Sequence, residues 1–217
     1  MFLFTTLLGI VIFKKIDTYF SNKLKDKIII YKDISEALYL TILSFIFALG
    51  STLFMLELIE VFKLHYFLGI GFGGLLYNTH YLFKTNQFSM CIHHIIMEFA
   101  IIIPILSKNN ILFYNNDYNI ILSRTLLCEW TNIFLNLSYI LLKLNMNHTI
   151  IFKLSNIILL IGYIFLRLIN FTSIQLLLYE RGDQFILYFM GIPLTILNYY
   201  WFIKLFNKFI NFIKVTY

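Results

Sequence analysis

The residues best suited to chemistry lie inside a strongly apolar stretch, Phe88–Leu106. This stretch carries two adjacent histidines and a glutamate, His93, His94 and Glu98. Ionisable side chains cost from about 3 to more than 10 kcal/mol at the centre of a bilayer, so they usually face a protein interior or a water-filled cavity. His94 and Glu98 share a helix face, whereas His93 points about 100° away. The pattern predicts a functional polar site, or else a histidine pair that neighbouring side chains satisfy.

A second apolar stretch, Tyr118–Leu142, carries polar residues at alternating steps of four and three. These residues are Thr125, Glu129, Asn132, Asn136, Tyr139 and Lys143. The spacing places them on one helix face. A polar stripe on an apolar helix is expected to face the interior of a bundle rather than lipid. Packing between helices is the alternative role, because interhelical hydrogen bonds contribute only about 0.6 kcal/mol on average.

Further polar residues are expected to converge on the same axis of the bundle. They are Asn78 and His80 near the end of a glycine-rich stretch, Arg167 in a later stretch, and Asn198 in the last one. Arg167 is a candidate partner for Glu129 as well as for a ligand. Histidine and glutamate are metal-ligating types, but adjacent histidines point in different directions, so we expect no metal site at His93 and His94.

The composition indicates a polytopic membrane protein. The chain of 217 residues is 60% hydrophobic and 13% charged, with a mean hydropathy of +0.81. Soluble domains hold about 45–50% apolar and about 25% charged residues. The net charge of +6 comes from lysines and arginines beside apolar stretches, which favours membrane orientation over nucleic-acid binding. The two cysteines, Cys91 and Cys128, lie inside predicted spans and form no disulfide framework.

The apolar stretches predict an all-α transmembrane bundle. They are Phe2–Phe13, Ile34–Leu56, Tyr66–Phe83, Phe88–Leu106, Tyr118–Leu142, Thr149–Leu176 and Gln184–Phe206. The first is only about 18 Å long as a helix, short for a span, so we expect a short anchor or an interfacial helix there. The expected organisation is an N-terminal segment and basic linker over residues 1–33, a transmembrane domain over 34–210 and a tail over 211–217.

The distribution of positive charge predicts the orientation. If the stretches alternate across the membrane, one side receives Lys14, Lys15, Lys23, Lys25, Lys27, Lys32, Lys84, Lys143, Lys204, Lys208 and Lys214. The other side receives Lys63, Lys108 and Arg181. Since lysine and arginine accumulate on the cytosolic side of membrane proteins, this asymmetry predicts a cytosolic C-terminus.

Four segments in order resemble the TLC domain of the TRAM–Lag–CLN superfamily. They are GIGFGGLLYNTHYL (Gly69–Leu82), IHHIIM (Ile92–Met97), LLCEWTNIFLNLSYILLK (Leu126–Lys143) and GYIFLRLINF (Gly162–Phe171). The resemblance covers about residues 34–210. It implies a barrel-like bundle of six helices around a lipid-sized cavity, most often in the endoplasmic reticulum.

The superfamily includes the ceramide synthases, which acylate sphingoid bases with acyl-CoA. This chain keeps their histidine pair but has Met97 at the threonine position of the signature. Glu129 and Asn132 stand where the synthases carry aspartates, and Asn78 stands where many members have Asp. These departures make the chain more similar to the small TLC-domain-containing proteins, which affect phospholipid composition, translocation or export without an established reaction.

The resemblance therefore implies a protein of membrane lipid composition or homeostasis, with membrane lipids as partners and no bound cofactor. One alternative is a ceramide synthase-like N-acyltransferase that uses acyl-CoA as co-substrate. In it His93 or His94 would act as base or nucleophile and Glu129 would orient the imidazole. A second alternative is a helper or cargo receptor without catalysis. In each case the expected cavity lining is Asn78, His80, Glu98, Thr125, Asn132, Asn136 and Arg167.

Overall fold

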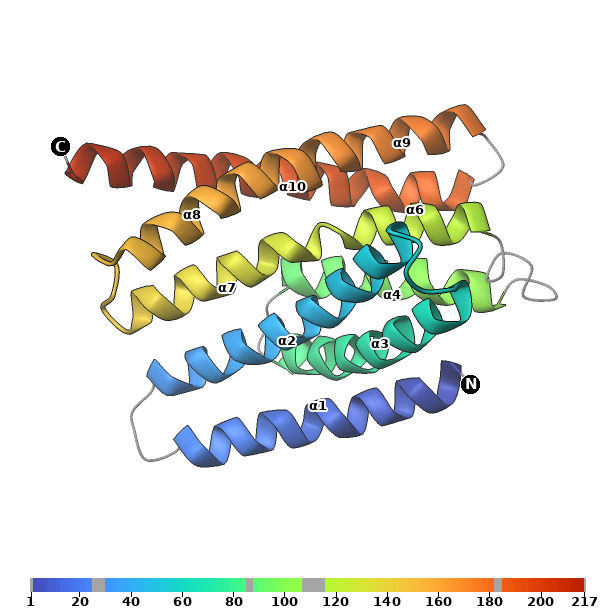
Figure 1. Cartoon of the computed structure of the whole chain (residues 1–217), viewed down its shortest axis with the longest axis horizontal. Coiled ribbons are helices and arrows are strands. Elements are labelled where there is room, and N and C mark those ends of the chain that lie inside the picture. The colour runs from blue at the N-terminus through green and yellow to red at the C-terminus, as the bar shows by residue number, and fades with distance from the viewer. Residues whose placement is uncertain (1, 25–29, 85–87, 107–115, 182–184, 217) are drawn as a thin grey trace.

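Every element in the described part of the chain is helical, as expected. The computed structural model describes residues 2–24, 30–84, 88–106, 116–181 and 185–216 (Figure 1). In chain order the elements are α1 (Phe2–Leu24), α2 (Ile30–Met55), α3 (Val61–Lys84), α4 (Phe88–Leu106), α6 (Asn116–Leu126), α7 (Glu129–Lys143), α8 (Ile150–Gly162), η2 (Tyr163–Ile169), α9 (Asn170–Arg181) and α10 (Phe185–Thr216). Residues 85–87, between the predicted stretches Tyr66–Phe83 and Phe88–Leu106, and the lysines Lys25, Lys27 and Lys108 lie outside the described residues.

Three described segments are long and apolar enough to cross a membrane. They are Ile34–Met55, Asp117–Lys143 and Ile150–Arg181. Large apolar side chains also cover outward surfaces, for example Leu3 (71% exposed) on α1 and Ile150 (67% exposed) on α8. Apolar surface of this extent is costly in water and normal against lipid. The fold is that of an all-helical membrane protein.

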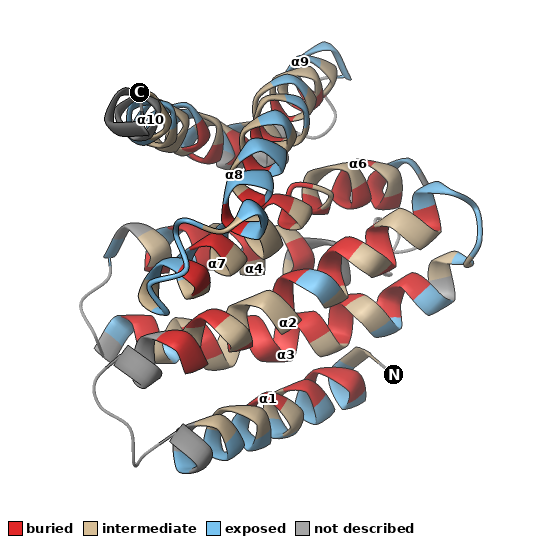
Figure 2. Cartoon of the chain, turned by 60° about the vertical axis from the view of Figure 1, so that its left-hand side comes forward, coloured by how far each residue is buried: buried red, intermediate tan, exposed pale blue. Residues whose placement is uncertain are grey.

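The first helix is longer than its apolar run. We expected a short element over Phe2–Phe13, but α1 continues to Leu24. Lys14 and Lys15 do not end it because lysine is a good helix former and both side chains are exposed. Figure 2 shows the outer side of α1 exposed and its inner side facing the bundle. The helix packs chiefly on α3, so it belongs to the folded bundle.

Small residues bring α1 and α3 into backbone contact. A Cβ atom on Gly73 would lie 2.2 Å from the Thr6 carbonyl oxygen, and one on Gly9 would lie 2.4 Å from the Ile70 oxygen. The Thr6 hydroxyl donates to the Phe2 carbonyl within its own helix at 2.9 Å, so it needs no partner across the interface. Helices in membranes associate through such close packing because lipid supplies no hydrophobic driving force between them.

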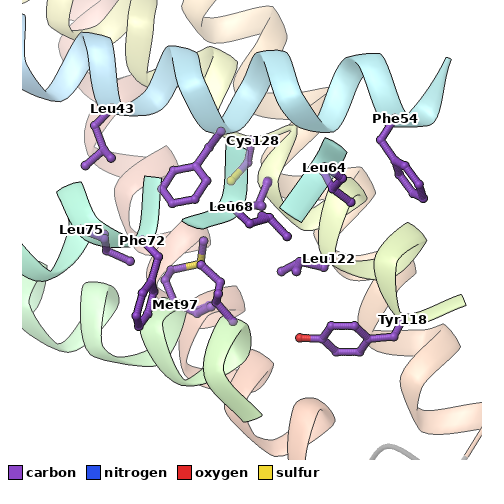
Figure 3. Packing of buried hydrophobic residues seen from close by; sticks show 14 of the residues in the cluster. Leu43, Phe54, Leu64, Leu68, Phe72, Leu75, Met97, Tyr118, Leu122 and Cys128 are labelled. Atoms are coloured by element: carbon purple, nitrogen blue, oxygen red, sulfur yellow. The ribbon is translucent and has the colours of Figure 1, made fainter. Parts of the chain in front are cut away.

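The apolar core lies between α2, α3, α4 and the α6–α7 segment. Figure 3 shows Leu43, Phe72, Leu75 and Met97 gathered there. Each of these side chains is at most 4% exposed. The core fixes the position of α4 relative to α2 and α7, and the side chains with chemical potential project from these helices.

The last turn of α1, the first turn of α2, the α7–α8 connection and the last turn of α10 lie at the same end of the bundle, on the left in Figure 1. Of the lysines that the charge pattern assigns to one side of the membrane, Lys14 and Lys204 lie in the second halves of α1 and α10, which lead to this end, and Lys143 is the last residue of α7. Residues 211–216, expected as a separate tail, continue α10.

Candidate functional site

A cavity of about 320 Å³ lies inside the bundle, with walls from α2, α3, α4, α7, α8, η2 and α10. Its apolar lining includes Leu40, Leu43, Phe47, Leu75, Met97 and Leu159. Its polar lining is Ser44, His93, His94, Glu129, Asn132, Asn136, Tyr163 and Arg167, with Trp201, Lys204 and Lys208 from α10. Ligand sites in proteins have volumes of about 300–1000 Å³ and combine apolar walls with a few polar groups in this way.

A break in the predicted Tyr118–Leu142 helix positions Glu129. The chain leaves α6 at Leu126 and enters α7 at Glu129, and the bonds across the break are short-range. Trp130 N–H donates to the Leu127 oxygen at 3.2 Å, and Thr131 N–H donates to the Cys128 oxygen at 3.0 Å. Glu129 therefore occupies the first turn of α7, where the helix dipole favours a negative charge.

A π-helix positions Arg167 opposite Glu129. Residues Tyr163–Ile169 form the π-helical segment η2 between α8 and α9. Such segments are rare, appear mostly as insertions within α-helices, and are frequently found at functional sites. The Arg167 guanidinium lies over the Tyr163 ring, 5.2 Å from its centroid, and the side chain is only 3% exposed. Irregular backbone at membrane depth is tolerated where it is buried in protein or lines a cavity.

Hydrogen bonds join the two charged groups through an amide. Arg167 Nη2 donates to Asn132 Oδ1 at 2.7 Å, and Asn132 Nδ2 donates to Glu129 Oε2 at 2.8 Å. The Ser44 hydroxyl donates to the same carboxylate oxygen at 2.7 Å.

Two more acceptors complete the shell of the guanidinium. They are Thr131 Oγ1 at 2.7 Å from Nε and Asn198 Oδ1 at 3.1 Å from Nη1. The expected pairing of Arg167 with Glu129 is therefore indirect, through Asn132.

The two histidines project from α4 into the same cavity. His93 packs edge-on against Trp201, with ring centroids 5.5 Å apart, and the two imidazole centroids are 5.7 Å apart. Both side chains are buried, and Nδ1 of each has no hydrogen-bond partner among the described residues. Most buried polar atoms in proteins are paired. Two unpaired imidazole nitrogens in one cavity are therefore suited to receive groups of a ligand.

Two lysines of α10 stand at one edge of the cavity. Lys204 and Lys208 line it and are also exposed, so they form part of its rim. With Arg167 inside, the rim and the interior present an excess of positive over negative charge. A ligand with an anionic group at its polar end matches this arrangement.

The structure brings together six of the sequence-predicted site residues and places four elsewhere. His93, His94, Glu129, Asn132, Asn136 and Arg167 line the cavity. Asn78 lines a separate pocket near the end of α3, and His80 is exposed. Glu98 lies one turn beyond His94, and its carboxyl group accepts a hydrogen bond from Thr79 of α3 at 2.6 Å. Thr125 precedes the helix break and lines a small cavity of about 50 Å³ beside Gly191.

Several residues of the site were not identified from the sequence. Ser44 is one of three serines in its apolar stretch and has no polar stripe to mark it, and Thr131, which accepts from Arg167, stands off the polar stripe of its helix. Lys204 and Lys208 were interpreted only as markers of orientation. Trp201 has no spacing pattern that links it to His93.

Among the described residues, no group of three or more histidine, cysteine, aspartate or glutamate side chains is arranged to hold a metal ion.

Fold and site together define the class of the protein: an all-helical membrane protein with an internal cavity that is apolar on most sides and carries a fixed polar network. A scan against protein-family models and searches of curated proteins and solved structures give no match to this chain.

Proposed function

We propose that the protein is a TLC-type integral membrane protein that binds a membrane lipid in this cavity and controls lipid composition. The observation that carries the proposal is the juxtaposition of apolar walls with the Glu129–Asn132–Arg167 network and the two unpaired histidines. An amphipathic ligand needs both surfaces, because its polar end loses hydrogen bonds to water when it enters the bundle. The proposal includes the six-helix TLC core, residence in the endoplasmic reticulum and a cytosolic C-terminus.

The volume of the cavity limits what enters it. About 320 Å³ is at the lower end of the usual range of ligand sites. The polar end of a lipid and the first part of one chain fill that space, and the remaining chain extends between helices toward the membrane. Lys204 and Lys208 at the rim favour a ligand whose polar end carries phosphate or another anion.

Acyl transfer from acyl-CoA is the second candidate, and the unpaired Nδ1 atoms of His93 and His94 favour it. In such a reaction an imidazole takes the proton from the acceptor amine as the amine attacks the thioester carbonyl. The carbon–sulfur bond breaks, and CoA leaves as the thiol. A positioned general base contributes about 100-fold to 10,000-fold in rate.

The test replaces each histidine and measures lipids. In cells from which the gene is deleted, His93→Gln and His94→Gln should fail to restore the sphingolipid and phospholipid profile that the wild-type chain restores. His80→Gln is the matched control, because His80 is exposed and outside the cavity, and it should restore the profile fully. Expression of each variant is measured in the same membranes.

Rescue by both cavity variants would contradict a lipid-binding role for the histidines and remove the acyltransferase candidate. Release of CoA thiol from a long-chain acyl-CoA by the purified protein, in the presence of a sphingoid base as the acceptor amine, separates the two candidates. Acyl transfer predicts release that His93→Gln, His94→Gln or Glu129→Gln lowers by at least about 100-fold, whereas lipid binding alone predicts none.

A further inference from the structure

Arg124 is a cation inside a membrane-crossing segment, Asp117–Lys143, and it takes no part in the site described above. It lines neither the main cavity nor the small cavity beside Gly191. On α6 one exposed residue and three partly exposed residues recur at steps of three and four, so they share a face of the helix. They are Asp117, Ile120, Arg124 and Leu127. The Arg124 side chain therefore belongs to the outer surface of the bundle.

Two side chains of α9 hold the guanidinium group of Arg124 in one orientation. Arg124 Nε donates to Asn170 Oδ1 at 3.3 Å, and Nη2 donates to Ser173 Oγ at 2.8 Å. Both acceptors are themselves fixed. Asn170 Nδ2 donates to the Arg124 carbonyl oxygen at 2.6 Å, and the Ser173 hydroxyl donates to the Asn170 carbonyl oxygen at 2.7 Å. The guanidinium is therefore preorganised, which lowers the entropic cost of binding a ligand.

Asn170 and Ser173 occupy only one edge of the guanidinium. Arginine carries five N–H donors in a planar fork. The two bonds to α9 use Nε and one N–H of Nη2, and the other N–H groups donate to no acceptor among the described residues. The edge formed by Nη1 and Nη2 therefore remains, and this edge matches two oxygen atoms of one anion.

No carboxylate of the described residues balances the charge of Arg124. Both of its acceptors are neutral, and Asp117, the acid on the same helix face, pairs with Arg181 at 3.0 Å. The undescribed ranges 107–115 and 182–184 adjoin α6 and α9 in sequence. Together they contain one lysine and one aspartate, so their formal charges cancel. A cation inside a membrane usually pairs with an anionic group, so an external anion is expected at Arg124.

Arg124 lies close below the lipid head groups. The segment Asp117–Lys143 has 27 residues, about 40 Å as a helix. A bilayer is about 40–45 Å thick with its head groups, and its hydrocarbon core is about 30 Å thick. Asp117 is therefore at the level of the head groups, at the end of the bundle opposite to the last turn of α10 (Figure 1). Arg124 follows seven residues later, about 10 Å deeper.

Exposed apolar side chains continue from this position toward the middle of the bilayer. Since Arg181 at the end of α9 pairs with Asp117, residues earlier in α9 and η2 lie deeper. Ile169 and Phe165 precede Ser173 at steps of four residues, and they are 54% and 59% exposed. An acyl chain that extends down from the guanidinium therefore meets apolar surface.

We propose that Arg124 binds the phosphate group of a phospholipid at the outer surface where α6 and α9 meet. Arginine binds phosphate through two parallel hydrogen bonds, and such charge-assisted bonds are about twice as strong as neutral ones. A carboxylate on the helix of a partner protein has similar chemistry. The phospholipid is favoured because its phosphate lies at the adjacent level of the bilayer and its chains match the apolar surface below Ser173.

This inference does not depend on the proposed function, because Arg124, Asn170 and Ser173 line no part of the main cavity. His93→Gln should leave binding at Arg124 unchanged. Failure of the histidine test and failure of the tests below are therefore distinguishable.

The first experiment uses the wild-type chain in micelles of a glycoside detergent that contains no phosphate. A trace of phosphatidylcholine with a photoreactive diazirine near the start of one acyl chain is added, and peptide mass spectrometry maps the label after illumination. We expect label on residues 165–173. A tenfold excess of unlabelled phosphatidylcholine should lower this labelling by about 10-fold by mass action. Diacylglycerol with the same chains, and inorganic phosphate, should leave it unchanged.

Each other outcome of this experiment overturns the inference. Equal competition by diacylglycerol would mean that the surface does not recognise phosphate. Competition by inorganic phosphate would assign the guanidinium to a soluble anion. Absence of label from residues 165–173 would exclude a phospholipid and leave the guanidinium to a carboxylate of a partner helix.

The second experiment repeats the labelling with variants. Arg124→Gln should lower the labelling of residues 165–173 by about 10-fold or more, as for the loss of a hydrogen bond to a charged group. Arg181→Gln is the matched control, because it removes a cation at the same end of the bundle that already has Asp117 as its partner. Its labelling should equal that of the wild type. Wild-type labelling of Arg124→Gln would contradict the site. If this variant does not fold, the competition measured on the wild-type chain decides.

Discussion

Arg167 donates a 2.7 Å hydrogen bond to the side-chain oxygen of Asn132, and this bond sets the direction of the amide. With its oxygen held by the guanidinium, the Asn132 amide presents its NH₂ group to Glu129 Oε2. The other carboxylate oxygen, Oε1, accepts a long hydrogen bond from the Cys128 thiol at 4.0 Å. A buried cation thus orients a buried carboxylate through a neutral residue.

Replacement of Arg167 should destabilise the fold strongly. Arg167→Met keeps the length of the side chain but leaves Thr131, Asn132 and Asn198 without their donor. Hydrogen bonds to charged groups contribute about 1.5–3 kcal/mol, and breaking a buried charged network costs about 3–5 kcal/mol. We expect the free energy of unfolding in mixed micelles to fall by about 3 kcal/mol or more.

Arg181→Met is the matched control for this prediction. Arg181 pairs with Asp117 at 3.0 Å, but the two side chains are 35% and 58% exposed. Exposed pairs contribute about 0–1 kcal/mol. Equal losses in the two variants would show that the network around Arg167 does not stabilise the bundle.

The sequence predicted that the protein is all-helical, and it predicted those site residues that recur at the spacing of one helix face. Glu129, Asn132 and Asn136 follow the stripe on one helix, and they line one cavity as that spacing required. The prediction failed at Thr125, because the hydrogen bonds around Cys128 interrupt the helix between Thr125 and Glu129. No proline or glycine marks this interruption, so the spacing of the polar residues alone predicts one continuous helix.

Relationships across helices were harder to predict. His94 and Glu98 share a face of α4, yet that face meets two neighbours: His94 reaches the cavity and Glu98 reaches α3. A spacing of four residues shows which side chains share a face of a helix. It does not show which neighbouring helix each of those side chains contacts. Ser44 shows the same limit, since its bond to Glu129 joins residues 85 positions apart.

The orientation of the chain gives the next prediction. The last turn of α1, the first turn of α2 and the last turn of α10 lie at the same end of the bundle (Figure 1), and the charge pattern of the sequence assigns most lysines to one side of the membrane. We expect a pH-sensitive tag inserted between α1 and α2 and one placed at the C-terminus to report the cytosol in both cases. Protease protection of sealed microsomes checks the result independently. Tags on opposite sides would mean an odd number of crossings between them and would contradict the arrangement.

The contact between α1 and α3 gives the last prediction. At Gly73 an added Cβ would meet backbone atoms of α1, the Thr6 oxygen at 2.2 Å and the Ile10 nitrogen at 2.7 Å, so only movement of the whole helix relieves the clash. Overpacking of this kind costs about 1–3 kcal/mol, and Gly73→Ala should lower the melting temperature in detergent. At Gly162 the nearest atom to an added Cβ is Thr131 Cγ2 at 3.4 Å, an ordinary contact. Gly162→Ala should therefore leave the melting temperature unchanged or raise it, because alanine favours a helix by about 1 kcal/mol over glycine. A Gly73→Ala protein as stable as Gly162→Ala would show that α1 does not pack on α3 at backbone contact.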